Sequence, residues 1–482
     1  MILYIENHTF GYELQRVAQM FFPGEKVTVS EGAPPADDRD SLCTRLADGL
    51  LLAECRRWGL SEFDDLSPAD QPADIEHKFG VLLYQILSRA TGIRPQWGVL
   101  TGIRPVKLFL SRMDAGMDEK ALRRHFIDGC LLSEERFSLA RETALAERPL
   151  LARSTPDSFS LYVSIPFCPT RCAYCSFVSH TVEKAAKLIP DYVDRLCEEL
   201  IHTAKIASDL HLKLRTVYFG GGTPTTLSAA QLGRVMGVIA DHFDLRELWE
   251  YTVEAGRPDT IDADKLSVIK AAGADRISIN PQTLSDKVLG AIGRKHSAAE
   301  VRDAFALARN CGFDNINMDL IAGLPSDTPE GFRASLDGVA AMEPENVTVH
   351  TLTVKRAARL AFEEAKSELM LVGGMVDYAW RTLAAAGYGP YYLYRQTGSL
   401  SSLENVGYAK PGREGLYNIY IMDETHTVLA VGAGASTKLR HPMTGEIERI
   451  YNYKYPYEYI ARPEAARERK DRVRAFYGQG GI

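Results

Sequence analysis

Three of the eight cysteines in the 482-residue chain fall within eight positions, at Cys168, Cys172 and Cys175. They follow the apolar, β-prone run Tyr162–Phe167, so the sequence predicts a short loop that leaves a strand. Thiolates bind soft iron well, and three of them on one loop can surround one face of a cubane [4Fe-4S] cluster. Three protein ligands would leave one iron of such a cluster open.

Two other uses of these cysteines compete with a cluster. The three cysteines could be buried thiols that only pack. In that case a polar, Pro-containing loop would have to bury three cysteines without using their chemistry. A zinc ion is the stronger alternative, but it would need a fourth ligand, and zinc sites usually pair two C-x2-C elements. This segment holds only one such element, Cys172-Ala-Tyr-Cys175. The spacing therefore favours iron over zinc.

At these residues the chain resembles the radical S-adenosylmethionine (radical SAM) superfamily. In that superfamily the amino and carboxylate groups of SAM chelate the open iron. The run from Tyr162 to Cys168 resembles the oxygen-independent coproporphyrinogen III dehydrogenase group, and the run from Cys168 to Phe177 is most similar to its HemZ branch. The resemblance implies a [4Fe-4S] cluster and SAM as cofactors, with Tyr162 and Tyr174 in the cofactor-binding region.

Composition excludes several other classes of function. The chain carries 56 Lys and Arg against 63 Asp and Glu, so it has no global basic footprint for nucleic acid or an anionic membrane. The first residues lack a basic, apolar leader, and no later run is apolar enough to span a bilayer. We therefore expect a cytoplasmic protein. The five remaining cysteines lie scattered in segments that we interpret as helical, which is typical of reduced structural thiols: Cys43, Cys55, Cys130, Cys197 and Cys311.

The length predicts two or three domains, and the pattern changes twice along the chain. Residues 1–155 are predicted to form an N-terminal α+β accessory domain, with strands near 3–5 and 26–30 and helices at 12–22, 41–57, 75–90 and 118–148. Residues 387–482 form a smaller C-terminal region that we expect to cover the barrel described next. In it, two strands are expected on either side of Asp423–His426, as an edge hairpin.

Strands and helices alternate regularly over the middle region, residues 156–386. Candidate strands are 160–165, 215–219, 250–254, 275–279, 315–320 and 346–352. Such alternation predicts parallel β/α units, whose functional residues gather at the carboxyl ends of the strands. The alternation is compatible with a barrel or with a doubly wound sheet. The resemblance implies the barrel. Radical SAM cores are partial (β/α)6 barrels.

Polar and glycine-rich segments end these strands. Gly220, Gly221 and Gly222, followed by Thr223, would let the backbone approach a ligand closely. This Gly-Gly-Gly-Thr segment resembles the family motif that binds the methionyl ammonium group of SAM. By the same resemblance, SAM is held by four further residues after the later strands: Glu254, Gln282, Arg294 and Asp319. Taken singly, each of these could instead be a solvated or structurally paired polar group.

The resemblance implies oxidative decarboxylation of two coproporphyrinogen III propionates to vinyl groups, which gives protoporphyrinogen IX. A tetracarboxylate tetrapyrrole substrate needs cations, and five are the first candidates: Arg104, Lys107, Arg395, Lys410 and Arg413. An external flavodoxin- or ferredoxin-type electron donor is implied as well, because the chain shows no flavin fingerprint or second cluster motif.

One position departs from the dehydrogenase pattern. The best-characterised branch carries a further cysteine two positions after the triad, where this chain has Phe177. The related haem-chaperone branch also lacks that cysteine. A haem carrier and a radical SAM enzyme acting on another tetrapyrrole therefore stay open beside the dehydrogenase.

Overall fold

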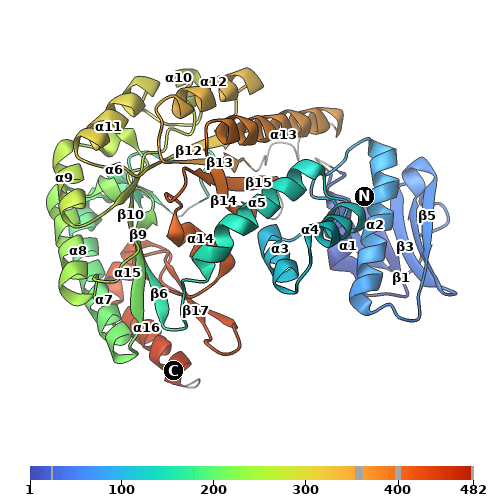
Figure 1. Cartoon of the computed structure of the whole chain (residues 1–482), viewed down its shortest axis with the longest axis horizontal. Coiled ribbons are helices and arrows are strands. Elements are labelled where there is room, and N and C mark those ends of the chain that lie inside the picture. Colours follow the sequence, from blue (N-terminus) through green and yellow to red (C-terminus); the bar gives the residue numbers. More distant parts are fainter. Residues whose placement is uncertain (23–24, 177–178, 353–361, 397–402, 479–482) are drawn as a thin grey trace. The chain divides into compact units, whose positions relative to one another are not determined.

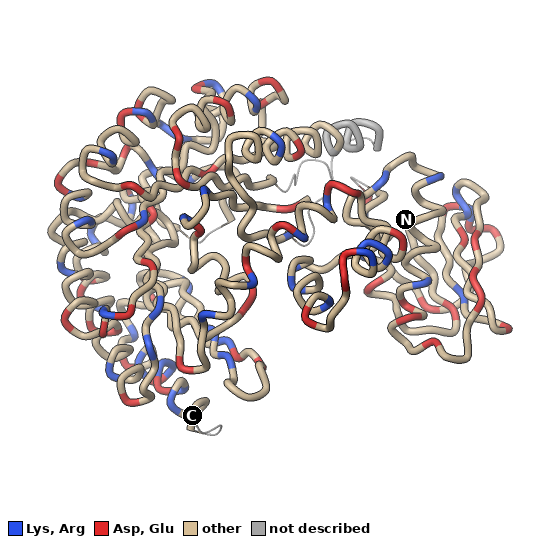
Figure 2. Tube along the Cα trace, viewed as in Figure 1, with Lys and Arg blue, Asp and Glu red and all other residues tan. Residues whose placement is uncertain are grey.

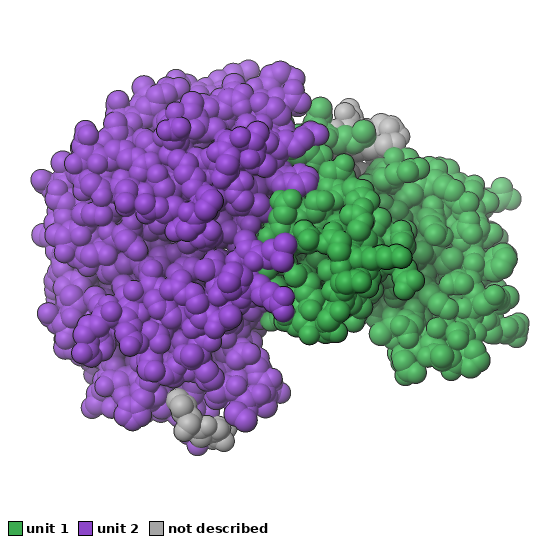
Figure 3. Space-filling view, in the orientation of Figure 1, with its two compact units in different colours: residues 1–144, 351–377, 393–405 green, residues 145–350, 378–392, 406–482 purple. Residues whose placement is uncertain are grey.

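The chain folds into two compact units (Figure 3) in a computed structural model that describes residues 1–22, 25–176, 179–352, 362–396 and 403–478. Unit 1 consists of Met1–Ala144, Thr351–Asp377 and Leu393–Asn405. Unit 2 consists of Leu145–His350, Tyr378–Tyr392 and Val406–Ile482. The three-part division expected from the sequence stays a prediction.

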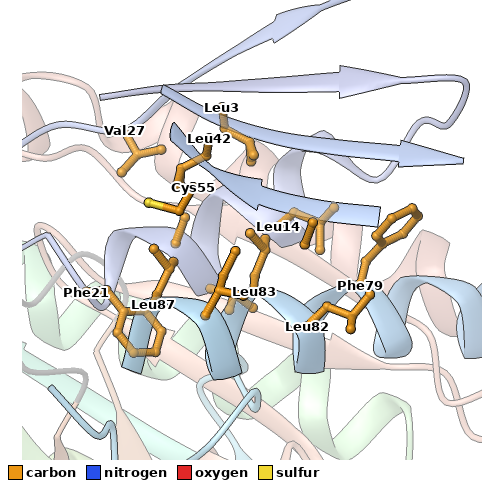
Figure 4. Packing of buried hydrophobic residues seen from close by; sticks show 14 of the residues in the cluster. Leu3, Leu14, Phe21, Val27, Leu42, Cys55, Phe79, Leu82, Leu83 and Leu87 are labelled. Carbon is orange, nitrogen blue, oxygen red and sulfur yellow. The ribbon is translucent and has the colours of Figure 1, made fainter. Parts of the chain in front are cut away.

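A five-stranded sheet and two helices form the core of unit 1 (Figure 1). The strand order is β2-β1-β3-β4-β5, and α1 and α2 pack on the sheet through apolar stripes that meet side chains of the strands (Figure 4). The bounds are β1 Ile2–Glu6, α1 Gly11–Gln19, β2 Thr28–Glu31, β3 Ser41–Ala47, β4 Leu50–Cys55, β5 Leu60–Asp65 and α2 Pro72–Thr91. The predicted strands near 3–5 and 26–30 and the helices 12–22 and 75–90 are confirmed.

The helix predicted over 41–57 is wrong, because this segment is the β3–β4 hairpin. Asp48 and Gly49 both have positive φ angles, 54° and 78°, as a tight two-residue hairpin turn requires. Asp-Gly between apolar runs is the local signal for such a turn, and it outweighs the helical spacing of the leucines. Cys43 and Cys55 therefore lie in strands, although both are free and buried as expected of structural thiols.

The chain that follows α2 is mainly helical up to Leu151, and the helix predicted over 118–148 is interrupted. The elements are α3 Pro105–Asp114, α4 Glu119–Arg123, the π-helical turn Arg124–Gly129 and α5 Glu134–Leu151. Cys130 to Ser133 break the helix, because Leu131 has a φ of 62°. The backbone of this break packs against Gly98, where a Cβ would lie 1.9 Å from the Cys130 oxygen.

The predicted parallel β/α units form one continuous sheet (Figure 1). Strands β6, β9, β10, β11 and β12 pair in parallel in that order, and β13 is the next strand of the sheet. Their bounds are Ser158–Ile165, Lys213–Gly221, Glu250–Glu254, Arg276–Ser278, Ile316–Ala322 and Asn346–Thr351, each within two residues of the prediction. This is the expected partial (β/α)6 barrel.

Helices connect these strands along the outer side of the sheet (Figure 1). Helix α7, Ile189–Asp209, buries one stripe that includes Tyr192, Val193, Leu196 and Leu200. The connecting helices are α6 Val182–Ala185, α7 Ile189–Asp209, α8 Ala229–His242, α9 Ala263–Ala271, α10 Asp286–Ala291, α11 Ala298–Asn310, α12 Pro329–Ala340 and α13 Phe362–Ala385. The short strands β7 Phe167–Cys168 and β8 His180–Thr181 pair separately.

The C-terminal residues extend the sheet at both ends. Its full order is β14-β15-β13-β12-β11-β10-β9-β6-β16-β17-β18. The added strands are β14 Gly389–Arg395, β15 Glu404–Ala409, β16 Thr427–Val431, β17 Ser436–Arg440 and β18 Ile447–Tyr451. Strand β16 pairs in parallel with β6, so it continues the barrel rather than forming an edge hairpin with the segment before it.

The strand expected just before Asp423 is instead helix α14, Leu416–Asp423. The Glu250 carboxylate, buried in β10, accepts hydrogen bonds from the Leu416 and Tyr417 backbone N–H groups at 2.5 and 3.3 Å. A carboxylate on the first N–H groups of a helix stabilises the helical start. That partner comes from a distant strand, which local periodicity could not reveal.

Two helices end the described chain, α15 Pro456–Ala461 and α16 Pro463–Gly478. Helix α16 is rich in charged residues, yet it buries Lys470 and Val473. Lys and Arg are interspersed with Asp and Glu along the trace (Figure 2). Within the described residues, no helix has both the length and the apolar character that crossing a bilayer requires.

Candidate functional site

The three motif cysteines lie in the loop that follows β6, at the carboxyl end of the sheet. Pairing of β7 with β8 closes this loop, with Cys168 opposite Thr181. The middle of the loop is held by the segment after α10: the Ala173 N–H donates to the Ile292 oxygen at 3.0 Å, and the Thr170 hydroxyl donates to the Gly293 oxygen at 2.8 Å. The loop is therefore anchored through its backbone and Thr170.

The donor set fits a cluster that is bound by one short loop. All three cysteines are partly exposed. The Thr223 hydroxyl approaches Cys168 Sγ at 3.5 Å, and Arg257 Nη1 lies 3.8 Å from Cys172 Sγ. Donors near the sulfurs suit thiolate ligands, whose charge they offset. Across the described ranges, no three His, Cys, Asp or Glu side chains converge on a single-ion site.

The glycine motif ends β9 directly beside the cysteine loop. The Gly222 N–H donates to the Ile165 oxygen at 2.8 Å, and the Thr223 N–H donates to the Phe167 oxygen at 2.7 Å. A Cβ on Gly222 would lie 2.5 Å from that Phe167 oxygen, so no side chain fits there. Glycine thus brings the β9 end and the start of the cysteine loop into backbone contact.

Tyrosines and a carboxylate line the barrel interior next to this motif. Tyr162 on β6 pairs in register with Tyr218 on β9, and their rings stack with that of Tyr417 from α14. Tyr218 donates to Glu254 Oε1 at 2.6 Å. Burial raises the pKa of Glu254 to about 7, although the Tyr218 hydrogen bond acts in the opposite direction.

Asp319 on β12 has the partners that its burial requires. Asn317 Nδ2 donates to Asp319 Oδ1 at 2.8 Å, and His350 Nε2 lies 3.6 Å from Oδ2. Burial alone would raise the pKa of Asp319, but the interactions with His350 and, after them, those with Asn317 and Arg276 together more than offset burial, so this pKa lies below its usual value. The carboxylate is therefore charged, and His350 is one of its polar partners.

Gln282 lies beside Asp319 in a strained conformation. Its φ is 67°, in the left-handed region that glutamine rarely adopts. Two backbone hydrogen bonds hold it there: the Gln282 N–H donates to the Asp319 oxygen at 2.8 Å, and the Ile321 N–H donates to the Gln282 oxygen at 3.0 Å. Strain of this kind gathers at functional sites, which fits a ligand-contacting role for Gln282.

Arg294 is buried rather than solvated, with 8% of its surface exposed. Its Nη1 donates to the Asn280 oxygen at 2.6 Å and to the Gly256 oxygen at 3.2 Å, and Nη2 donates to the Tyr174 hydroxyl at 3.2 Å. Burial raises the pKa of Tyr174, so the hydroxyl stays neutral. Arg294 and Tyr174 thus join the strand ends to the cysteine loop.

Two of the five cations predicted for substrate, Lys410 and Arg413, belong to unit 2. Lys410 donates to the Glu343 oxygen at 3.0 Å, and Arg413 Nη2 lies 3.4 Å from Asp314 Oδ2. Both therefore lie at the amino ends of β12 and β13, opposite the end that carries the cysteine loop. A role beside the cysteines does not fit this placement.

The other three cations belong to unit 1. Arg395 is buried, its Nη1 donates to the Leu100 and Gly102 oxygens, and its guanidinium lies over the Trp97 ring. Burial lowers the pKa of Arg395 to about 10. These contacts are structural. Arg104 precedes α3 as its N-cap residue and Lys107 is exposed within α3, so both stay predictions as carboxylate partners.

Two residues near the site were missed by the sequence analysis. Tyr218 on β9 lies in register with Tyr162 on β6, so the two side chains point to the same face of the sheet. The alternation of side chains along a strand could have indicated this. Arg257 follows β10 in Gly256-Arg257-Pro258, where only its position after a strand could have indicated a role. Phe177, the departure from the dehydrogenase pattern, lies outside the described residues.

Comparisons with known proteins agree with this geometry. Residues 162–338 match the radical SAM superfamily model. The chain is 36% identical over 466 residues to the oxygen-independent coproporphyrinogen-III oxidase-like protein HemZ of Bacillus subtilis, covering 94% of this chain and 93% of that protein. It is 31% identical to the heme chaperone HemW of Haemophilus influenzae over 62% of this chain and 75% of the chaperone.

A solved structure supports the fold. The coproporphyrinogen III oxidase HemN from Escherichia coli aligns with a TM-score of 0.50 and 23% identity, covering 67% of this chain and 72% of that one. Radical SAM proteins use a [4Fe-4S] cluster and SAM, and the three-thiol loop fits that requirement. The chain therefore belongs to the radical SAM superfamily and, within it, to the oxygen-independent coproporphyrinogen III oxidase-like family.

Proposed function

We propose that the chain catalyses oxidative decarboxylation of coproporphyrinogen III propionates to vinyl groups, without oxygen, and so forms protoporphyrinogen IX. The observation that carries the proposal is the similarity to HemZ, an oxidase-like protein, over 94% of the chain. The same comparisons support the chain's place in a radical SAM oxidoreductase family.

We assign the cluster to Cys168, Cys172 and Cys175 and SAM to the strand ends beside them. When bound, these cofactors supply the one-electron chemistry that breaks a C–H bond which no side-chain base could deprotonate. The chain contributes acceptors and donors in fixed places. Glu254 and Asp319 accept hydrogen bonds from amino or ribose groups, and the Gly220–Thr223 backbone lets the methionyl end approach closely.

Gln282 and Arg294 complete the proposed SAM contacts. The Gln282 amide can donate to and accept from a ribose hydroxyl, and its backbone is fixed against β12. Arg294 Nε is buried and has no hydrogen-bond partner among the described residues, so one donor of a buried cation remains for a carboxylate. Tyr162 and Tyr174 line the same end of the barrel. An external flavodoxin- or ferredoxin-type protein would supply the electron.

The test is anaerobic reconstitution with iron and sulfide, followed by incubation with coproporphyrinogen III, SAM and a chemical reductant. We expect vinyl products and 5'-deoxyadenosine to appear together, both measured by mass spectrometry. Omission of SAM is the control. Vinyl formation without SAM consumption, or SAM cleavage that leaves coproporphyrinogen III intact, would contradict the proposal.

The similarity to HemW supports a second candidate, a haem carrier. That similarity covers 62% of the chain, whereas HemZ matches nearly all of it, which favours the enzyme. Titration with haem distinguishes the two. A carrier would show a stoichiometric Soret band and no substrate-dependent 5'-deoxyadenosine, and the enzyme would show the reverse.

The pKa of Glu254 near 7 predicts pH-dependent SAM binding. If the ionised carboxylate accepts hydrogen bonds from SAM, affinity should rise about tenfold between pH 6 and pH 8, since the ionised fraction rises from about 0.1 to about 0.9. Calorimetry on the reconstituted protein measures this directly. Glu254→Gln should give a pH-independent affinity over that range, and an equal slope in both proteins would contradict the assignment.

The same pKa has an opposite effect on folding stability. The native Glu254 carboxyl holds its proton up to about pH 7, whereas an unfolded glutamate ionises near 4.5. Its contribution to stability is therefore present below pH 4.5 and is lost as the pH rises through 7. Ligand binding and folding thus respond to pH in opposite directions at this residue.

A further inference from the structure

Arg257 reaches into the cysteine loop from the end of β10. Its side chain is buried, with 3% of its surface exposed, and most of its donors point at the loop. Nη2 donates to the Thr170 hydroxyl at 3.0 Å, and Nη1 lies 3.4 Å from the Thr170 oxygen and 3.8 Å from Cys172 Sγ. One guanidinium therefore contacts both the backbone of the loop and a proposed ligand sulfur.

Neighbouring residues fix the orientation of this guanidinium. Asp259 Oδ1 accepts from Arg257 Nε at 3.1 Å, and Oδ2 accepts from Nη2 at 3.3 Å. The carboxylate also lies 3.8 Å from Nδ1 of the buried His296. A two-point contact with a carboxylate holds the planar guanidinium in one plane, which leaves Nη1 aimed at the loop.

The contacts of Arg257 differ from those expected of a structural arginine. A buried guanidinium is costly unless its charge and donors are used. Asp259 balances one charge on one side, and the opposite side faces a sulfur that becomes a thiolate when it binds metal. Hydrogen bonds and positive charge at a cluster sulfur stabilise the reduced, more negative cluster and so raise its reduction potential.

We propose that Arg257 is a positioning residue that holds Cys172 in its ligating place and raises the reduction potential of the cluster bound there. The proposal rests on the cluster assignment made under Proposed function. It adds a role for a residue outside both the cysteine motif and the proposed SAM contacts. Arg257 acts on the cluster through the Cys172 sulfur and through Thr170.

The test compares Arg257→Gln and Arg257→Lys with the wild type. The control is Arg246→Gln, which removes an exposed arginine whose partner, Asp244, lies two residues before it. Each protein is reconstituted anaerobically, its fold is checked by circular dichroism, and its iron and sulfide are counted. The midpoint potential of the cluster is then measured by titration monitored with electron paramagnetic resonance, a property that a merely structural role would not change.

We expect Arg257→Gln to shift the midpoint potential to a more negative value, Arg257→Lys to shift it less, and Arg246→Gln to leave it unchanged. If Arg257→Gln folds but takes up no cluster, the holding role is supported and the potential is judged on Arg257→Lys. A wild-type potential in whichever Arg257 variant carries a full cluster overturns the proposal. Failure of the wild type to bind a cluster would instead refute the underlying cofactor assignment.

Discussion

Replacing Cys172 by alanine is expected to abolish the iron-sulfur absorption and SAM cleavage together. Two thiolates on one loop cannot hold the cluster in place of three, so activity should fall by more than the roughly 10- to 100-fold loss that is typical when only residues around the ligands are changed. The fold should survive, since the loop is anchored by the β7–β8 pairing and by Ala173, not by the Cys172 sulfur. Absorption spectra and 5'-deoxyadenosine production measure both effects.

Cys311→Ala is the matched control for this variant. Cys311 is free and half-buried at the end of α11. Its replacement by alanine therefore removes the same kind of sulfur at a position away from the site. It should keep the wild-type iron content. A full cluster spectrum in Cys172→Ala, or an equal loss of iron in both variants, would refute the ligand assignment.

Glu199→Ala is expected to lower the free energy of unfolding of unit 2 by about 3–5 kcal/mol, the usual cost of leaving one half of a buried ion pair. Glu199 on α7 and Lys470 on α16 are 4% and 5% exposed, and their charged atoms lie 3.3 Å apart. The Glu199 carboxylate also accepts from the Gly432 N–H at 2.8 Å, the Tyr459 hydroxyl at 2.7 Å and Asn452 at 3.0 Å. Its loss therefore leaves several buried donors unpaired.

The same change should loosen the loop that follows β16. Gly432 begins this loop with a φ of 92°, and the Ala433 oxygen accepts from the Ser164 hydroxyl at 2.8 Å, two residues before the cysteine loop begins. Chemical unfolding followed by circular dichroism measures the loss of stability, and iron uptake measures any effect on the cysteine loop.

Glu198→Ala provides the neighbouring control. Glu198 lies in the same helix but is 39% exposed, and it pairs with Arg195 at the surface. Exposed pairs contribute about 1 kcal/mol or less, so its unfolding midpoint should stay close to that of the wild type. Equal destabilisation by the two variants would show that the buried network contributes no more to the free energy of unfolding than the exposed pair does.

Sequence patterns were sufficient for the barrel strands, although the local Asp48-Gly49 turn signal in the β3–β4 hairpin was missed. The six barrel strands were predicted within two residues because apolar, β-branched runs repeat between amphipathic helices. Local pattern failed where a distant partner decides the structure. Helix α14 begins at Leu416 because Glu250 of β10 accepts its first N–H groups, and nothing near Leu416 in the sequence indicates that carboxylate.

The sequence by itself indicated the cofactor chemistry, because Cys168, Cys172 and Cys175 lie within eight positions of one loop and the segment resembles the radical SAM superfamily. Only the tertiary structure decided which charged residues meet that loop. It brings Arg257 to Cys172 and places Lys410 at the opposite ends of the strands. The physical reason is that strand order and direction decide where a side chain from a distant segment lies, and these depend on long-range pairing that local periodicity does not encode.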